Sequence, residues 1–231
     1  MNSTPEHKPR PMVDLLVSVI LPSLILMKLS GEDALGVSGG LIVALAFPLG
    51  WGLFELVKYK KFNFIALLGL ISVLLTGSIG LFELDNKWLA IKEASVPALI
   101  GIAVLVSTFT PYPLVRALLF NASMMDVETI KEKLAENNST ALFEKKLMNA
   151  TYFIAGSFAF SATMNYLLAK WIVVSPSGTE AFNEELGQMT LYSYPVIAIP
   201  SMIMMMATFY YLWRAINKAT GLKLEDLLVN K

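Results

Sequence analysis

The sequence contains no cysteine and only one histidine, His7. Without cysteine the chain forms no disulfide framework and no thiolate metal site, and it has no cysteine nucleophile. His7 lies in a polar N-terminal segment, so neither a histidine metal centre nor a histidine proton shuttle is indicated. We therefore expect no metal and no cofactor.

Charged residues are also scarce, because they make up 16% of the 231 residues, against about 25% in soluble domains. The formal net charge is zero, so no overall field attracts nucleic acid. Apolar residues make up 55% of the chain, which suits a surface that faces lipid. The composition indicates an integral membrane protein whose first partner is the lipid bilayer, with no nucleic acid.

Motifs of the common enzyme classes are missing as well. The chain has no Ser/His/Asp set, no glycine motif for dinucleotides or phosphates after a strand, and no HExxH. The glycine-rich residues 36–40 open an apolar segment, which favours close helix packing over phosphate binding. The methionines of 202–206 have no Cys or His beside them, so we interpret them as packing residues rather than copper ligands. We expect no enzymatic activity.

What the chain does have is a series of long apolar segments. About 20 residues of helix, at about 1.5 Å per residue, cross a bilayer core of about 30 Å. Six segments approach or meet that length: 12–29, 35–57, 62–84, 88–110, 147–174 and 191–213. The sequence therefore predicts an all-α integral membrane protein with six transmembrane helices, arranged as three helical hairpins.

The polar segments define the predicted domain organisation. Residues 1–11 are expected to be a disordered cytoplasmic tail, residues 12–218 the membrane domain, and residues 219–231 a second cytoplasmic tail. Within the membrane domain we predict a cytoplasmic helical insert at about 120–146 and an acidic outer loop at about 175–190. A helix that begins at Ser139 or Thr140 is expected to continue into the fifth apolar segment.

Basic residues give the predicted orientation. With six spans, 14 of the 18 Lys and Arg residues fall on the side that carries both termini. The four on the other side are Lys28, Lys87, Lys92 and Lys170. Since Lys and Arg concentrate in cytoplasmic loops, both termini are predicted to be cytoplasmic.

Ionisable residues near the ends of the spans form a candidate charge cluster. Its members are Asp14, Glu55, Lys58, Arg116 and Arg214. Charge inside a bilayer is expensive, so we predict that at least one carboxylate of the cluster pairs with a cation from another helix. Two interpretations stay open, which are interfacial ion pairing and a buried site for an anion or a proton.

A second candidate is a polar stripe on the fifth apolar segment. Thr151, Ser161 and Asn165 fall on one broad helix face by their spacing. Hydrogen bonding between helices and the lining of a polar pathway would both use such a stripe. Prolines also interrupt several spans, as in the broken helices of transporters, although prolines are common in membrane helices. They are Pro22, Pro48, Pro97, Pro195 and Pro200.

Several segments together resemble a known family. They are Asp14-Leu15-Leu16, residues 75–82, residues 103–107, Pro113-Leu114-Val115, and residues 141–147 leading into the fifth span. In order, spacing and hydropathy the chain resembles the bacterial inner-membrane proteins called intracellular septation protein A, together with broader relatives named only as conserved membrane proteins. The chain differs from that pattern by its longer cytoplasmic region and its longer acidic outer loop.

The resemblance implies a multi-pass protein of the bacterial inner (cytoplasmic) membrane with a role in cell-envelope maintenance and septation. It also implies contacts with other envelope or division membrane proteins, and no catalytic residues. The leading hypothesis is therefore a non-enzymatic protein that acts through protein or lipid contacts. The alternative is a transporter of small solutes or lipids that uses a polar path between the helices.

Overall fold

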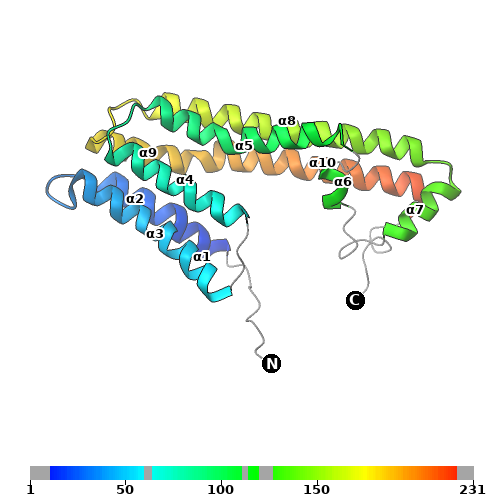
Figure 1. Ribbon diagram of the computed structural model, residues 1–231, viewed down its shortest axis with the longest axis horizontal. Helices are drawn as coiled ribbons and strands as arrows, with labels where there is room; N and C mark the ends of the chain where they lie inside the picture. Colours follow the sequence, from blue (N-terminus) through cyan, green and yellow to red (C-terminus); the bar gives the residue numbers. More distant parts are fainter. Residues whose placement is uncertain (1–10, 60–63, 111–113, 120–126, 223–231) are drawn as a thin grey trace. The chain divides into compact units, whose positions relative to one another are not determined.

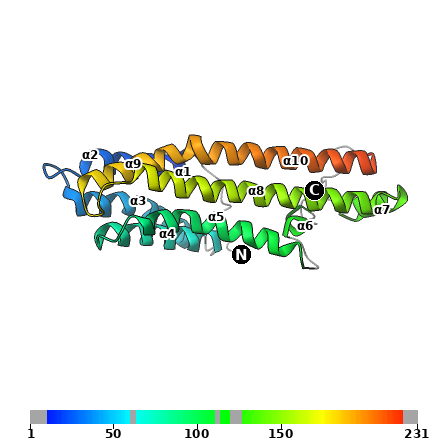
Figure 2. The same cartoon turned by 90° about the horizontal axis from the view of Figure 1, so that it is seen from above.

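Every regular element in the described part of the chain is a helix. The computed structural model describes residues 11–59, 64–110, 114–119 and 127–222, which Figures 1 and 2 show from two sides. The helices are α1 (Pro11–Leu15), η1 (Leu16–Ile20), α2 (Leu21–Leu29), α3 (Gly36–Tyr59), α4 (Phe64–Leu81), α5 (Lys87–Ser107), α6 (Leu114–Leu119), α7 (Val127–Glu136), α8 (Thr140–Ile172), α9 (Glu180–Ser193), η2 (Tyr194–Ala198) and α10 (Ile199–Thr220). The predicted all-α class is confirmed for these residues.

Four helical stretches are long and apolar enough to cross a membrane. They are Met12–Leu29, Gly36–Phe54, Lys87–Ser107 and Glu180–Thr220, and Ile71–Leu81 is a shorter apolar helix. The chain therefore has the helices of a multi-pass membrane protein. The long helix α8 is not among the four, and it carries several polar residues along its length, including Asn149 and Asn165. The count of six spans stays a prediction.

Two of the apolar helices contain a π-helical turn shortly before a proline. The turn η1 ends at Ile20, ahead of Pro22 in α2, and η2 ends at Ala198, ahead of Pro200 in α10. Proline lacks a backbone N–H and its ring crowds the carbonyl of the preceding turn. A wider turn at that place relieves the crowding, so both helices continue past their prolines without a break.

The chain divides into two compact units, which we describe separately. Unit 1 holds the described residues of Met1–Ala94 and Met164–Val196, and unit 2 those of Ser95–Thr163 and Ile197–Lys231. In unit 1, α2 packs against both α3 and α9, and α3 packs against α4 (Figure 1). At Gly187 of α9, a Cβ atom would lie 2.8 Å from the carbonyl oxygen of Ser23. Helices α2 and α9 therefore approach each other so closely at this point that a residue larger than glycine would clash with the α2 backbone.

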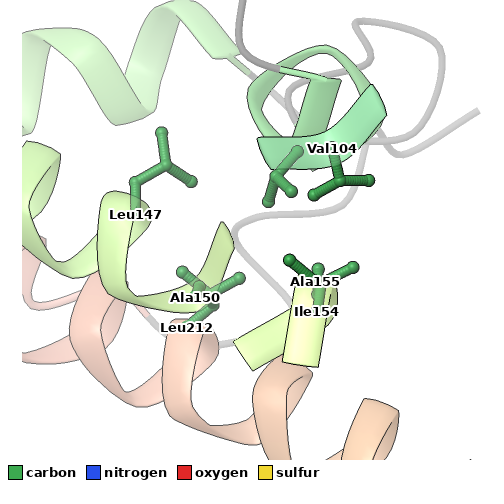
Figure 3. Packing of buried hydrophobic residues seen from close by; sticks show 7 residues of the cluster. Val104, Leu147, Ala150, Ile154, Ala155 and Leu212 are labelled. Carbon is green, nitrogen blue, oxygen red and sulfur yellow. The ribbon is translucent and has the colours of Figure 1, made fainter. Parts of the chain in front are cut away.

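The described residues of unit 2 form two apolar clusters. The first joins α8 to α5, α6 and α10, and Figure 3 shows most of its side chains pointing toward one another. Its members are Val104, Val115, Leu147, Ala150, Ile154, Ala155 and Leu212. The second packs α7 against the starting turn of α8 and the end of α10, through Ile130, Leu134, Phe143, Ile216 and Ala219. Apolar burial of this kind stabilises by about 25 cal/mol for each Å² removed from water.

The segment predicted as an acidic outer loop is shorter than the sequence suggested. Helix α9 already begins at Glu180, because the Thr179 hydroxyl caps it by accepting a hydrogen bond from the Phe182 N–H (3.1 Å). The helix then continues through η2 and α10, so the predicted sixth span is part of a longer helical run. The acidic residues of this segment lie on a helix rather than in a loop.

Two other predicted boundaries can be compared with the structure. Helix α8 runs unbroken from Thr140 to Ile172, so the helix that the sequence places after Ser139 does continue into the fifth apolar segment. Helix α10 extends to Thr220 and ends at Gly221, whose φ of 75° is a left-handed conformation that glycine adopts readily. The predicted tails, apart from Pro11 and 219–222, lie outside the described residues, as do positions 120–126 of the predicted insert.

Candidate functional site

The most buried ion pair among the described residues lies inside an apolar helix. Lys92 and Glu93 are both on α5, and their side chains are 10% and 23% exposed. The Lys92 Nζ atom lies 2.6 Å from Glu93 Oε1. It also donates a hydrogen bond to the Thr76 hydroxyl of α4 (2.6 Å), and this hydroxyl donates to the Ser72 carbonyl. The pair therefore links α4 to α5 and satisfies the lysine with two oxygen partners.

An ion pair at this place is costly unless both partners are present. Lys92 lies within the apolar stretch Lys87–Ser107, and charge inside a membrane span is rare and tends to mark function. Removing one partner of a buried pair typically costs about 3–5 kcal/mol, because the other charge is left uncompensated. In the sequence Lys92 is counted only as one of the four basic residues on the side opposite the termini. Lys92 lies more than one helical turn after Trp88, an aromatic residue of the kind found at membrane interfaces, and this spacing was the available sign that it lies inside the span.

The predicted charge cluster is seen only in part. Asp14 of α1 accepts a hydrogen bond from the Trp51 indole N–H of α3 (3.1 Å). Arg116 of α6 pairs with Glu144 of α8, a carboxylate that the sequence analysis had not selected. Arg214 is exposed on α10. The side chains of two further members, Glu55 and Lys58, lie outside the described residues.

The described members of the predicted charge cluster lie in different units and have different partners. Asp14 belongs to unit 1, whereas Arg116 and Arg214 belong to unit 2. The cluster as a whole therefore stays a prediction. An ion pair between helices does form at Arg116, but both of its partners are more than a third exposed. A pair in that environment contributes about 0–1 kcal/mol.

The predicted polar stripe lies on one continuous helix, α8. Thr151 is completely buried, and its hydroxyl donates to the Leu147 carbonyl one turn earlier (3.0 Å). Ser161 and Asn165 are half-buried farther along the same helix. The uninterrupted helix places the three residues on one broad face, as predicted from their spacing. Whether this face lines a polar pathway stays a prediction.

A polar network that the sequence analysis missed closes the loop end of unit 1. The Asn86 side-chain amide donates to the carbonyls of Val173 (3.2 Å) and Ser175 (2.6 Å), and its oxygen accepts from the Ser177 hydroxyl (2.8 Å). Glu185 of α9 accepts from the backbone N–H groups of Val174 and Ser175. These bonds hold the turn after α8 against the start of α5 and the side of α9.

Asn183 is the most deeply buried polar residue of this region. Its side chain is fully buried, and its amide nitrogen donates to the Ser30 hydroxyl (3.0 Å) and the Val37 carbonyl (2.8 Å). Its Oδ1 atom is buried without a hydrogen-bond partner among the described residues. One side chain of α9 thus fixes both ends of the turn between α2 and α3.

The turn before α5 contains a carboxylate whose pKa is perturbed. The backbone N–H of Lys87 donates to the Asp85 carboxylate (2.8 Å), and this bond lowers the pKa of Asp85. The Lys87 ammonium, 3.4 Å away, acts in the same direction. Both side chains are exposed, so the interaction is electrostatically weak.

The described residues contain no group of three or more His, Cys, Asp or Glu side chains that could hold a metal ion. Comparison with known proteins gives no further assignment. No protein-family model matches the chain, and searches of curated proteins and of solved structures also found no match. The functional argument therefore rests on the residues described above.

Proposed function

We propose that this chain is a six-span protein of the bacterial inner membrane, with both termini cytoplasmic, that acts without catalysis in cell-envelope maintenance or septation. It would act through contacts with other membrane proteins or with lipids. The resemblance to intracellular septation protein A motivates the biological role. The observation that supports this mode of action is that unit 2 holds α7 by one face and leaves its other face exposed.

Helix α7 is amphipathic and is held firmly by its apolar face. Ile130 and Leu134 are 0% and 4% exposed, and they pack against Phe143 of α8 and Ile216 of α10. The Asn137 side chain adds a hydrogen bond to the Ala219 carbonyl (3.0 Å). A short helix anchored in this way is a preorganised surface, so a partner need not order it on binding.

The opposite face of α7 carries charge of both signs. Its exposed residues include Glu128, Lys131, Glu132 and Glu136. Such a mixed pattern suits recognition of a complementary protein surface, because opposite and like charges together select one partner and one register. It suits membrane-surface binding less well, because that calls for an excess of basic residues.

The remaining two spans of the proposal are α4 and α8. Helix α4 has the length of a short span, with 18 residues, and α8 has 33 residues. The distribution of Lys and Arg supports cytoplasmic termini, which would also place α7 in the cytoplasm. Single cysteines at Glu32 and Asn138 test this arrangement, because both residues are exposed. An impermeant thiol reagent should label only Glu32→Cys in intact cells, and labelling of Asn138→Cys would reverse the proposed orientation.

An exchange of charges on α7 tests the mode of action. The variant Lys131→Glu with Glu132→Lys keeps the net charge and leaves the buried face of α7 intact. In cells that lack the native chain, we expect this variant to reach the membrane in normal amount but to fail in restoring cell length and septum placement. The matched control is Lys28→Glu with Glu32→Lys, at two exposed residues of unit 1. Full restoration by the α7 variant would rule out this face as the contact surface.

The partly buried Lys92–Glu93 pair favours a second candidate function, which is transport along a polar path. Ionisable pairs within spans are typical of ion and proton pathways. Reconstituted liposomes loaded with a pH-sensitive dye would report proton flux. Flux above that of protein-free liposomes, abolished by Glu93→Gln, would favour transport over the contact function. Flux equal to that of protein-free liposomes would argue against proton transport.

A further inference from the structure

The start of α8, which lies beside the end of α10, and the end of α10 both carry basic residues, and one of these residues contacts an aromatic ring of α10. Both segments belong to unit 2, and the two views agree that they run side by side (Figures 1 and 2). The basic residues are Lys145 and Lys146 of α8 and Arg214 and Lys218 of α10. We call these four residues, together with Tyr211, the basic patch.

Tyr211 organises the patch. The Lys146 Nζ atom lies 5.5 Å from the centroid of the Tyr211 ring, within the range of a cation–π interaction. Phe153 meets the same ring edge-on, with the ring centroids 5.7 Å apart. Tyr211, Arg214 and Lys218 follow one another at helical spacings of three and four residues, so they share one stripe of α10. The stripe therefore continues from the Lys146 contact toward the end of α10.

The patch has no internal counter-charge. Among the described residues no carboxylate pairs with Lys145, Lys146 or Arg214, and none pairs with Lys218. The nearest acidic residue in the sequence, Glu144, is engaged by Arg116. Four cations without carboxylate partners create a local positive potential that an anion would neutralise.

An exposed apolar surface continues from the patch along α10. Met202, Ile203, Met206 and Tyr210 are 58%, 61%, 64% and 56% exposed, and they recur at the three- and four-residue spacing of one helix face. A phospholipid has the same division, with an anionic phosphate at one end and acyl chains beyond it. Basic sites beside apolar helix surfaces are a common mode of recognition of anionic headgroups.

We propose that the basic patch binds the phosphate group of an anionic phospholipid, with the acyl chains lying along the exposed face of α10. Lys146 and Arg214 would contact the phosphate, and Tyr211 would hold Lys146 in place. The inference rests on the proposed insertion in a membrane, but it is independent of a role in septation. Its failure and the failure of the septation proposal are therefore distinguishable.

The test uses the full chain purified in a neutral detergent. Phosphatidylglycerol and phosphatidylcholine with identical acyl chains are titrated separately, and bound lipid is counted by native mass spectrometry. We expect phosphatidylglycerol to be retained and phosphatidylcholine to be lost. The variant Lys146→Gln with Arg214→Gln should bind phosphatidylglycerol about 25-fold more weakly, from roughly fivefold for each cation removed. Equal retention of the two lipids would overturn the proposal.

Two control variants separate loss of the site from loss of charge or of fold. Lys146→Arg with Arg214→Lys preserves both cations and should retain phosphatidylglycerol binding. Lys28→Gln with Lys170→Gln removes two exposed cations elsewhere, one of them the lysine beside the Tyr166 ring at the other end of α8. It should bind like the native chain, and equal weakening in this control would overturn the proposal.

A last measurement distinguishes binding of the lipid from binding of free phosphate. Inorganic phosphate at the lipid concentration should neither displace phosphatidylglycerol nor raise the thermal unfolding midpoint, because it lacks the acyl chains that contact α10. Equal stabilisation by inorganic phosphate would show a simple anion site and would contradict the assignment to a lipid.

Discussion

The loop end of unit 1 and the α7 end of unit 2 are held together by different kinds of interaction. In unit 1, side-chain hydrogen bonds from Asn86 and from the buried Asn183 hold the connecting turns. In unit 2, an apolar cluster around Phe143 holds α7, while the charged residues stay exposed. The first end is held by directional hydrogen bonds, whereas the second is held by apolar contacts and leaves charged side chains exposed.

This difference indicates which kind of substitution should destabilise each unit. Hydrogen bonds depend on particular atoms, so the loop end of unit 1 should respond to changes of chemistry at constant volume. Apolar contacts depend on filled volume, so the α7 end of unit 2 should respond to changes of size. Four substitutions test this difference between the units, in decreasing order of expected effect on the free energy of unfolding.

Phe143→Ala should have the largest effect. Phe143 is 3% exposed at the centre of the second apolar cluster, and loss of a buried phenylalanine costs about 3–5 kcal/mol. Leu142→Ala, at a neighbouring residue that is 55% exposed, should change the free energy of unfolding by less than about 0.5 kcal/mol. Unfolding by denaturant in detergent measures both variants. Protease cleavage at Lys131 in the Phe143 variant alone would show that α7 has been released.

Asn183→Ala should have the next largest effect. It removes both hydrogen bonds to the turn between α2 and α3, including the one to the buried Ser30 hydroxyl, and loss of a partner for a buried polar group costs about 1–3 kcal/mol. Asn149→Ala in unit 2 is the matched control, because Asn149 is exposed and lies 3.5 Å from the Tyr211 hydroxyl. Equal midpoints for the two variants would contradict the view that unit 1 depends on directional bonds.

Gly187→Ala should destabilise unit 1 by a smaller net amount. The added Cβ would lie 2.8 Å from the Ser23 carbonyl oxygen, and overpacking costs about 1–3 kcal/mol. Alanine gains about 1 kcal/mol over glycine in helix propensity, which offsets part of that cost. Gly156→Ala on α8 meets no atom within 4 Å and should therefore be stabilising. Opposite signs for the two thermal midpoints are the expected result.

The smallest effect concerns pH. Because the Lys87 N–H lowers the pKa of Asp85 in the folded state, the interaction contributes stability above the unfolded pKa and loses it as pH falls through the folded value. The thermal midpoint of the native chain should therefore approach that of Asp85→Asn as pH decreases from about 5 toward 3. Asp33→Asn removes one negative charge at another exposed aspartate and is the control for a general effect of net charge.

Part of this arrangement could be predicted from the sequence. The apolar segments indicated the helices because their length and composition are local properties. The polar insert likewise contained an amphipathic pattern that matches α7, with Ile130 and Leu134 on one face. The shared face of Thr151, Ser161 and Asn165 followed from helical spacing alone.

The remaining features depend on contacts between distant segments. Asn183 and Ser30 are 153 residues apart, and nothing in either local sequence marks them as partners. Lys92 was counted only among the basic residues on the side opposite the termini, because its contact with Thr76 of α4, which partly buries it, cannot be read from the local sequence. The prediction was that a carboxylate of the charge cluster pairs with a cation from another helix, and Arg116 of α6 pairs with Glu144 of α8, a residue outside that cluster. Sequence pattern defines which residues are polar, and tertiary packing decides which of them meet.

The π-helical turn η2 has a consequence for insertions and deletions. Successive residues of an α-helix are separated by about 100° around the axis, and a π turn holds one residue more than an α turn. Deleting one residue from Tyr194–Ala198 could convert that turn to ordinary α geometry without interrupting the helix. A deletion within regular helix elsewhere would have no such surplus residue to absorb it. The five residues of η2 therefore mark a place where the chain could lose one residue while the side chains of α10 keep their orientation about the helix axis.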